Sequence, residues 1–418
     1  MLYLDYKIRM EILSVKDNRA LFYFIITTLS ISPACTSDLI DNRNYLLIGA
    51  MFLGPLIIIF SNRIIEKIDT PIALLIITIF LTQIIFHFST IRFSSIFFSC
   101  MYLIYFSATI RVFKRAKITA NNFISVLRGL IIAYAIILLI QQFCVLTGLP
   151  VINQLGTTSD NSWKLNSLSA EPSHTSRYVG LLMYTLLIEF DYKIGYKASF
   201  YFSFRQNKWT WICFLWIMLT IQSGTAFLIL IIIFARYISR QRIIMASIIL
   251  TIISLGGIYG NFKPLKRSVT FVASIFTGNP KEMISADPSA SVRVVPTILC
   301  LERINPFSIN GWIGEGSGSI STWMSKEFPG VKKGWTGGAT AGYTLEYGLL
   351  VGLLLLVFTF KWCYDPNHKL ESIGFWVICL VLEGINMQMA WLCITLLYLS
   401  KQKPYINQEQ SNSHLARL

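Results

Sequence analysis

Long apolar runs recur along this chain from residue 21 to residue 399, and they leave few ways to fold it. Stretches such as GLIIAYAIILLI and GLLLLVFTF are apolar on every face of a helix, whereas a helix of a soluble protein keeps one polar face. Hydrophobic residues make up 54% of the 418 and charged residues only 14%. The sequence therefore predicts an all-α polytopic membrane protein.

Eleven segments are predicted to cross the membrane: 21–34, 45–60, 71–88, 93–110, 123–147, 173–190, 209–222, 225–238, 243–260, 340–360 and 373–399. The two that meet at QSGT (222–225) are short for the about 20 residues of a crossing, so their tip is expected inside the protein. The last segment contains Glu383, Gly384 and Asn386 and could instead be two short helices. That alternative gives twelve segments and moves the C-terminus to the other side.

The expected organisation has transmembrane helices over 1–260, a loop subdomain over 261–339, C-terminal transmembrane helices over 340–400 and a polar tail over 401–418. The N-terminus shows no clear cleavage site for a signal peptide, so we expect the first helix to be retained.

Basic residues in the short connections predict the orientation. One alternating set of connections holds only Arg43, Arg92 and Lys164. The other holds seventeen: Lys7, Arg9, Lys16, Arg19, Arg63, Lys67, Arg111, Lys114, Arg115, Lys117, Lys193, Lys197, Arg205, Lys208, Arg236, Arg240 and Arg242. This asymmetry predicts a cytoplasmic N-terminus and places the loops 148–170 and 261–339 outside.

A polar heptad occurs twice, as EPSHTSR at 171–177 and as DPSASVR at 287–293. In each, an acid precedes Pro and Ser, and an Arg stands six places after the acid. An acid followed by Pro favours a helix start, because the carboxylate caps free N–H groups and Pro fits the first turn. Glu171, His174 and Arg177 are predicted to share one helix face.

The second helix is expected to be short, because Pro296 follows Arg293 closely. Both copies are predicted to face outward, where two helix N-termini and two arginines would hold a diphosphate. Acid-Pro-Ser is also an ordinary capping sequence, and the repeat alone could be a coincidence. Arg177 favours a functional role for the first heptad, since an ionisable residue near the start of an apolar membrane helix is usually functional.

Other polar residues give weaker signals. His174 alone could be structural, Glu189 and Glu346 are expected near membrane interfaces, and Glu383 is ambiguous. The nine basic residues of loop 261–339, against five acidic ones, could attract anionic lipid head groups or an anionic substrate. Cys300 is alone in that loop, no metal-binding motif is present, and GEGSGS (314–319) is expected to be a flexible loop.

The order of several motifs resembles the Wzy-type polysaccharide polymerases, within the O-antigen polymerase and ligase superfamily. The motifs are SLSAEPSHTSRYVGLL, QSGTAFLILIIIFAR, ADPSASVR, NPFSINGWIGEGSGS and AGYTLEYGLLVGLLLL, over residues 168–360. The resemblance implies an inner-membrane glycosyltransferase that joins undecaprenyl-diphosphate-linked oligosaccharide repeats on the periplasmic face. It needs no cofactor, and its expected partners are these repeats, the membrane and a chain-length regulator, not nucleic acid.

The resemblance assigns site residues here. Arg177, Arg293 and Arg303 would bind the substrate diphosphate without a metal. Glu171 or His174 would be the catalytic base. Asp287, Ser173, Ser289 and Glu315 would support the site.

Two other functions stay open. Ligases of the superfamily carry a His several residues before ExGLLxG, which GWTGGATAGYTL (334–345) lacks, and this disfavours a ligase. A polysaccharide flippase would be expected to show two similar halves with charges near the midplane.

Overall fold

The computed structural model describes residues 2–32, 44–60, 66–153, 163, 165–221, 223–237, 263–328 and 340–402. Within these ranges the chain is largely helical and contains no strand. Among the described residues, three helices are long and apolar enough to cross a membrane: α4 (Asp69–Phe86), α5 (Phe93–Ala116) and α6 (Ala120–Thr147). The expected all-α class is thus confirmed for the described residues, and a polytopic arrangement remains a prediction.

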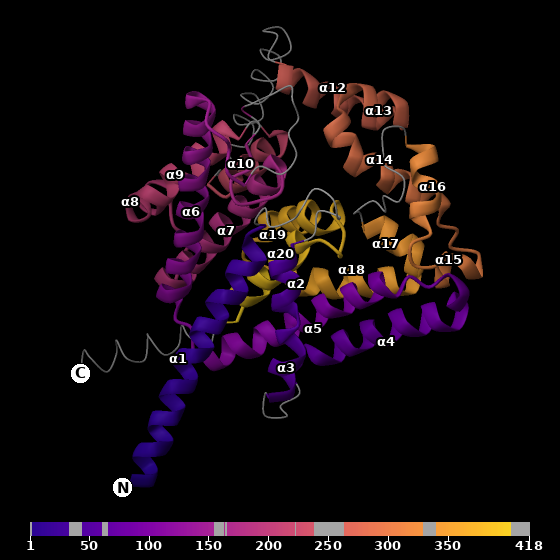
Figure 1. Ribbon diagram of the computed structural model, residues 1–418. Coiled ribbons are helices and arrows are strands. Elements are labelled where there is room, and N and C mark those ends of the chain that lie inside the picture. Colours follow the sequence, from indigo (N-terminus) through magenta and orange to yellow (C-terminus); the bar gives the residue numbers. More distant parts are fainter. Residues whose placement is uncertain are drawn as a thin grey trace.

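Figure 1 shows the remaining helices in their order along the chain. Before the subdomain they are α1 (Leu2–Ser30), α2 (Tyr45–Met51), α3 (Leu53–Phe60), η1 (Phe88–Thr90), α7 (Pro172–Ile194), α8 (Phe200–Gln206), α9 (Lys208–Thr220) and α10 (Gly224–Ala235). Then come α12 (Lys263–Thr277), α13 (Pro280–Ala286), α14 (Pro288–Arg303), α15 (Ile309–Ile313), α16 (Ile320–Glu327), α17 (Thr340–Tyr347), α18 (Leu349–Cys363), α19 (Lys369–Trp376), η3 (Val377–Val381) and α20 (Gln388–Ser400). The expected span 243–260 lies outside the described residues.

The expected span 340–360 is interrupted at Gly348, where α17 ends and α18 begins. Gly348 has φ +91°, and a Cβ there would lie 2.1 Å from the carbonyl oxygen of Trp312. Only glycine fits such a left-handed position against a neighbouring backbone. The prediction of a single helix over this stretch was therefore wrong, because hydropathy does not detect a turn made by one glycine.

The expected span 373–399 also turns back. The chain leaves η3 after Val381, passes Gly384 at φ +89°, and re-enters helix at Gln388. The amide of Gln388 donates to the carbonyl oxygens of Leu29 and Ile31, each at 2.9 Å, and Lys401 Nζ donates to that of Tyr364 at 3.1 Å. Hence α20 starts beside the end of α1 and returns to the end of α18, as in the two-helix alternative.

Contacts bring the basic connections together at one end of the helices. Arg19 Nε donates to the carbonyl oxygen of Ala116 at 3.0 Å, and Arg111 pairs with Asp69 at 2.6 Å. At the opposite end, Ser99 donates to Asn386 at 2.6 Å. This grouping agrees with the predicted alternation, in which the basic connections lie on one side of the membrane. The orientation itself stays a prediction.

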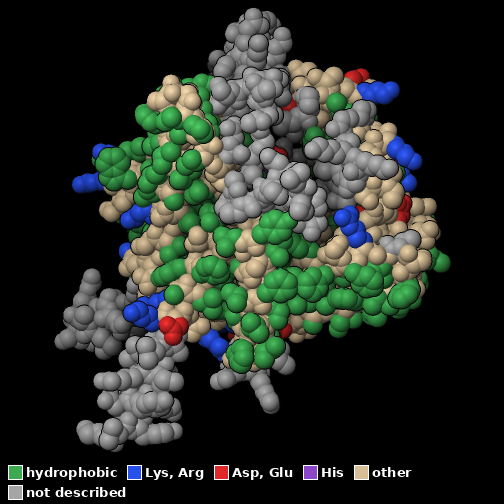
Figure 2. Space-filling model, in the orientation of Figure 1, with side chains coloured by type: hydrophobic (Ala, Val, Ile, Leu, Met, Phe, Trp, Pro, Cys, Tyr) green, Lys and Arg blue, Asp and Glu red, His purple; other side chains and the backbone are tan. Residues whose placement is uncertain are grey.

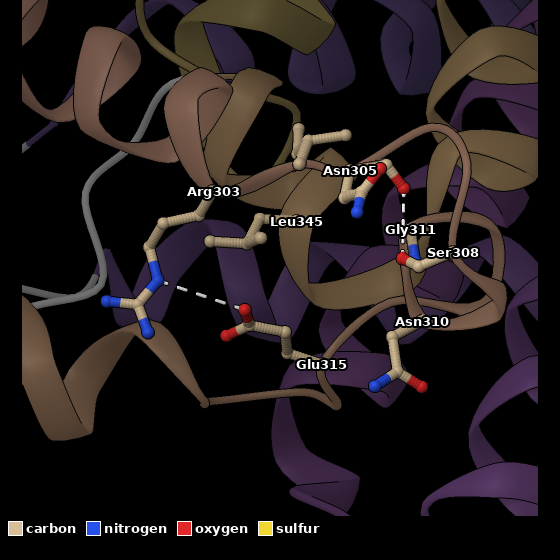
Figure 3. A pocket seen from close by; sticks show the side chains of 8 residues that line it. Arg303, Asn305, Ser308, Asn310, Gly311, Glu315 and Leu345 are labelled. Atoms are coloured by element: carbon tan, nitrogen blue, oxygen red, sulfur yellow. Dashed lines mark hydrogen bonds and ion pairs between the residues drawn. The ribbon is translucent and has the colours of Figure 1, made fainter.

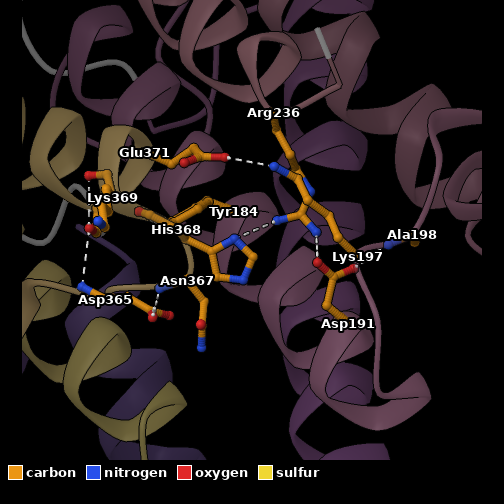
Figure 4. A network of polar contacts seen from close by, with 11 residues as sticks. Tyr184, Asp191, Lys197, Ala198, Arg236, Asp365, Asn367, His368, Lys369 and Glu371 are labelled. Atoms are coloured by element: carbon orange, nitrogen blue, oxygen red, sulfur yellow. Dashed lines mark hydrogen bonds and ion pairs between the residues drawn. The ribbon is translucent and has the colours of Figure 1, made fainter. Parts of the chain in front are cut away.

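A buried polar network fixes the end of α7 on the basic side (Figure 4). Arg236, at the end of α10, forms an ion pair with Asp191 and lies 3.4 Å from Nδ1 of His368. The hydroxyl of Tyr192 donates to Asp365 at 2.8 Å. Burial, followed by the Arg236 charge, lowers the pKa of His368, which lies in the connection between α18 and α19.

The described part of the chain forms two hydrophobic cores. The larger joins α1, α5, α6, α7 and α20, and Figure 2 shows further hydrophobic side chains on the surface over α4 and over α6 and α9. The exposed ones include Ile77, Ile85, Phe143 and Leu146, an arrangement that suits a lipid environment. The smaller core holds Phe271, Met283, Val295, Cys300, Ile320, Met324, Phe328, Ala341 and Leu345, so α17 shares a core with α12, α13, α14 and α16.

Candidate functional site

Helix α7 begins at the first heptad. Pro172 occupies its first turn and Glu171 its N-cap, as predicted. The capping role predicted for the Glu171 carboxylate was wrong, since the side chain makes no cap hydrogen bond. It accepts a hydrogen bond from the Ser173 hydroxyl at 3.2 Å instead. A competing local hydroxyl and exposure to solvent take the place of the backbone N–H groups.

Arg177 lies two turns into α7 and is buried, with 1% of its surface exposed. Its Nη1 forms an ion pair with Oε1 of Glu383, and its Nε donates to the carbonyl oxygen of Ser173 at 3.1 Å. Its Nη2 is also buried and has no hydrogen-bond partner among the described residues. The positive charge that was expected to await a diphosphate is therefore already paired with a carboxylate.

His174 approaches the same carboxylate. Its Nε2 lies 3.9 Å from Oε2 of Glu383. The side chain of His174 is 17% exposed, against 7% for Glu383 and 1% for Arg177. The predicted shared face is thus confirmed for His174 and Arg177, and His174 is the member of this Arg177–Glu383–His174 cluster that a ligand reaches most easily.

Glu383 reaches the cluster because the chain turns where it does. The π-helical η3 ends at Val381, and the positive φ of Gly384 directs the chain away directly after Glu383. Sequence reasoning left this residue ambiguous, although a carboxylate inside an apolar run was a signal. Its partners are about 200 residues earlier in the chain, so no local pattern identifies them.

The second heptad also starts a helix, but that helix is longer than predicted. Asp287 precedes α14, and its carbonyl oxygen accepts from Ser291 N–H at 2.9 Å. Pro296 lies inside α14, which continues to Arg303, so a helix ended by Pro296 was wrong. Packing of α14 against α13 and α17 offsets the backbone bond that Pro cannot make. The side chains of Ser289 and Arg293 lie outside the description, and two facing arginines remain a prediction.

Arg303 lies at the end of α14 and lines a small pocket with Glu315, Asn310 and Leu345 (Figure 3). Its Nε lies 3.8 Å from Glu315 and its Nη1 3.5 Å from Glu327. Among the described residues, no ion pair joins this region to the Arg177 cluster. Like Arg177, Arg303 already has carboxylate neighbours.

The glycine-rich segment 314–319 is a loop, as expected, but it is held in place. Backbone N–H groups of Glu315 and Gly316 donate to the carbonyl oxygens of Leu345 and Glu346, at 2.9 and 3.0 Å. The N–H of Ser317 donates to the side chain of Gln83 at 2.8 Å. The loop therefore joins the end of α17 to the end of α4.

No cluster of three His, Cys, Asp or Glu side chains that could hold a metal occurs among the described residues. The described cysteines, Cys300 included, are free thiols. The described chain is thus a largely helical protein with helices able to cross a membrane and a buried ionic cluster near the start of α7. The chain matches no family model, no curated protein and no solved structure.

Proposed function

We propose that the chain is a polysaccharide polymerase of the bacterial inner membrane, acting on O-antigen or capsule repeats. It joins polyprenyl-diphosphate-linked oligosaccharides on the periplasmic face. The observation that carries the proposal is the Arg177–Glu383–His174 cluster near the N-terminal end of α7, where Glu383 meets two residues of the first heptad. The motif order of residues 168–360 supplies the substrate class.

The cluster is arranged for proton transfer from a hydroxyl. A histidine beside a carboxylate gains a proton readily, because the carboxylate stabilises the imidazolium that forms. His174 is accessible while Glu383 is covered, so the imidazole meets the acceptor and the carboxylate supports it. Arg177 forms an ion pair with Glu383 and holds this carboxylate in place.

The proposed reaction transfers a sugar from the lipid diphosphate to a hydroxyl group of the acceptor. The acceptor hydroxyl oxygen bonds to the anomeric carbon of the donor sugar, and the bond from that carbon to the diphosphate oxygen breaks. The hydroxyl proton passes to the imidazole of His174 and from there to solvent. The lipid diphosphate leaves with the bonding electron pair. We assign its stabilisation to Arg293, because the charge of Arg177 is already paired.

The genetic test is deletion of the gene followed by gel analysis of surface polysaccharide length. Loss of the polymerase leaves single repeat units on the surface where a ligase is present. Loss of a ligase would leave long polymer on the lipid carrier, and loss of a flippase would trap single units on the cytoplasmic side. Either of these last two patterns would overturn the proposal.

The biochemical test uses purified protein and lipid-diphosphate-linked repeats of the native structure, with a chelator present. Dimers and longer oligomers, with released polyprenyl diphosphate, are expected. His174→Ala, Glu383→Gln and Arg177→Ala should each reduce product formation by about 100-fold or more. Lys281→Gln, on the exposed side of α13, is the matched control and should retain activity. Absence of product from authentic repeats would count against a polymerase.

Orientation has its own test. Topology reporters fused at Lys281 should read periplasmic, and those at Lys114 cytoplasmic. The reverse result would place the cluster on the side where nucleotide-activated sugars occur and would remove the reason for a lipid-linked donor.

A further inference from the structure

The pocket beside Arg303 is built from one short stretch of the subdomain and the end of α17. Arg303, Ile304, Asn305, Ser308, Asn310, Gly311, Glu315 and Leu345 line a cavity of about 40 Å³ (Figure 3). One water-sized group needs about 10–15 Å³ of such space. The cavity therefore has room for a few hydroxyl groups on one edge of a ring rather than for a large ligand.

The local charge is unfavourable for a phosphate. One guanidinium faces two carboxylates, those of Glu315 and Glu327. The guanidinium also lies over the ring of Trp323, 4.1 Å from its centroid. A diphosphate entering here would meet two negative charges for one positive charge.

The same groups suit a neutral polyhydroxyl ligand. A sugar hydroxyl both donates and accepts hydrogen bonds, and the pocket lining offers a carboxylate acceptor, a guanidinium donor and an amide that does both. Leu345 adds an apolar contact for the C–H face of a ring. Neutral hydroxyls also leave the Arg303 and Glu315 charges in balance.

The pocket backbone is fixed before any ligand binds. The Ser308 hydroxyl donates to the carbonyl oxygen of Asn305 and accepts from Gly311 N–H, both at 3.0 Å. A Cβ at Gly311 would lie 1.8 Å from that same carbonyl oxygen, so the turn requires glycine. Trp312 Nε1 donates to the carbonyl oxygen of Pro306 at 2.8 Å. Such preorganisation reduces the entropy lost on binding.

Helix α17 connects the pocket to the Arg177–Glu383–His174 cluster. At one end, the Thr340 hydroxyl donates to the carbonyl oxygen of Leu380 at 3.0 Å, three residues before Glu383. Further along, Leu345 lines the pocket. The five residues from Thr340 to Leu345 rise about 7.5 Å along the helix axis. Helix α17 therefore links the pocket to the segment of chain that carries Glu383.

We propose that the Arg303 pocket binds a sugar ring of the saccharide substrate and not its diphosphate. The proposal rests on the proposed function and changes the role first expected of Arg303. It makes the pocket a subsite that holds the saccharide in register while another sugar of the same chain lies at His174.

Binding of two probes to the full-length protein tests the assignment. One probe is the oligosaccharide repeat released by mild acid from the native surface polysaccharide, which carries no phosphate linkage to lipid. The other is inorganic pyrophosphate. Isothermal titration should show that Glu315→Gln and Asn310→Ala weaken oligosaccharide binding on the order of tenfold. Lys281→Gln should not.

Pyrophosphate should not compete with the oligosaccharide at this pocket. Competition by pyrophosphate, or unchanged oligosaccharide affinity in both variants, would overturn the subsite. Circular dichroism confirms that each variant is folded, and Asn310→Ala removes an exposed side chain without altering the charge balance. The outcome is separable from the polymerase test, because polymer formation with unchanged binding would refute only the subsite, and binding without polymer formation would refute only the polymerase.

Discussion

Replacing Glu383 by Gln removes the only negative partner that the structure describes in ion-pair contact with Arg177. Gln has nearly the same shape, so the packing around it is kept while the charge is lost. Arg177 then remains positive, with a side chain only 1% exposed to solvent. Breaking a buried ion pair by removing one partner costs about 3–5 kcal/mol. We expect a loss of that size in the free energy of unfolding.

A double-mutant cycle isolates the charge pair from side-chain shape. Arg177→Met keeps an apolar stem and strands the Glu383 carboxylate, so this single change should also destabilise strongly. The variant with both changes leaves neither charge of this pair, and replacing a whole buried pair is often close to neutral. We therefore expect the double variant to lose less than half of the sum of the two single losses.

The measurement is equilibrium unfolding in mixed micelles, followed by tryptophan fluorescence. A loss under about 1 kcal/mol for Glu383→Gln is the value of an exposed pair and would refute the buried pairing. Losses that simply add in the double variant would refute it as well. In either case Glu383 would not support His174, and the proposed role of His174 in proton transfer would be refuted.

Three further experiments test other parts of the fold. Gly348→Ala should destabilise by about 1–3 kcal/mol in the same assay, because its Cβ would collide with Trp312 at a left-handed φ; an unchanged midpoint would contradict the turn. Burial and Arg236 lower the pKa of His368 from its ordinary 6.5, so the folded state takes up fewer protons than the unfolded state. The thermal midpoint should be steady above about pH 6.5 and fall below it, and His368→Gln should weaken this dependence. Burial raises the pKa of Cys300 to about 12, so its thiol should react with a maleimide only after unfolding, which mass spectrometry of labelled peptides detects.

Local patterns predicted local structure well. The apolar runs gave the helices of residues 45–235 closely, and the acid-Pro pairs located the starts of α7 and α14. These signals depend on residues a few places apart. The same rules failed at Pro296, because the tertiary contacts of α14 compensate for a helix-breaking residue.

Turns inside apolar stretches were predicted poorly, and the candidate site depends on them: the turn at Gly348 was missed, and the break around Gly384 was one of two alternatives. Gly348 and Gly384 each reverse or redirect a run that hydropathy treats as one helix. The redirection at Gly384 decides which way Glu383 points, and thereby which residue pairs with Arg177. A one-residue backbone feature thus controls a contact between segments about 200 residues apart.

The pairing of Arg177 also changes how the repeated heptad is understood. Two opposite charges in contact exert little net field on a third ion. If Arg177 and Arg293 both bound the diphosphate, neither would therefore be expected to form an ion pair with a carboxylate. Arg177 does form such a pair, next to a histidine that remains accessible. The first heptad is therefore better suited to hold the base, and the second is left with the leaving group. On this division Arg177→Lys should lower the unfolding free energy and the rate together, whereas Arg293→Lys should lower the rate alone.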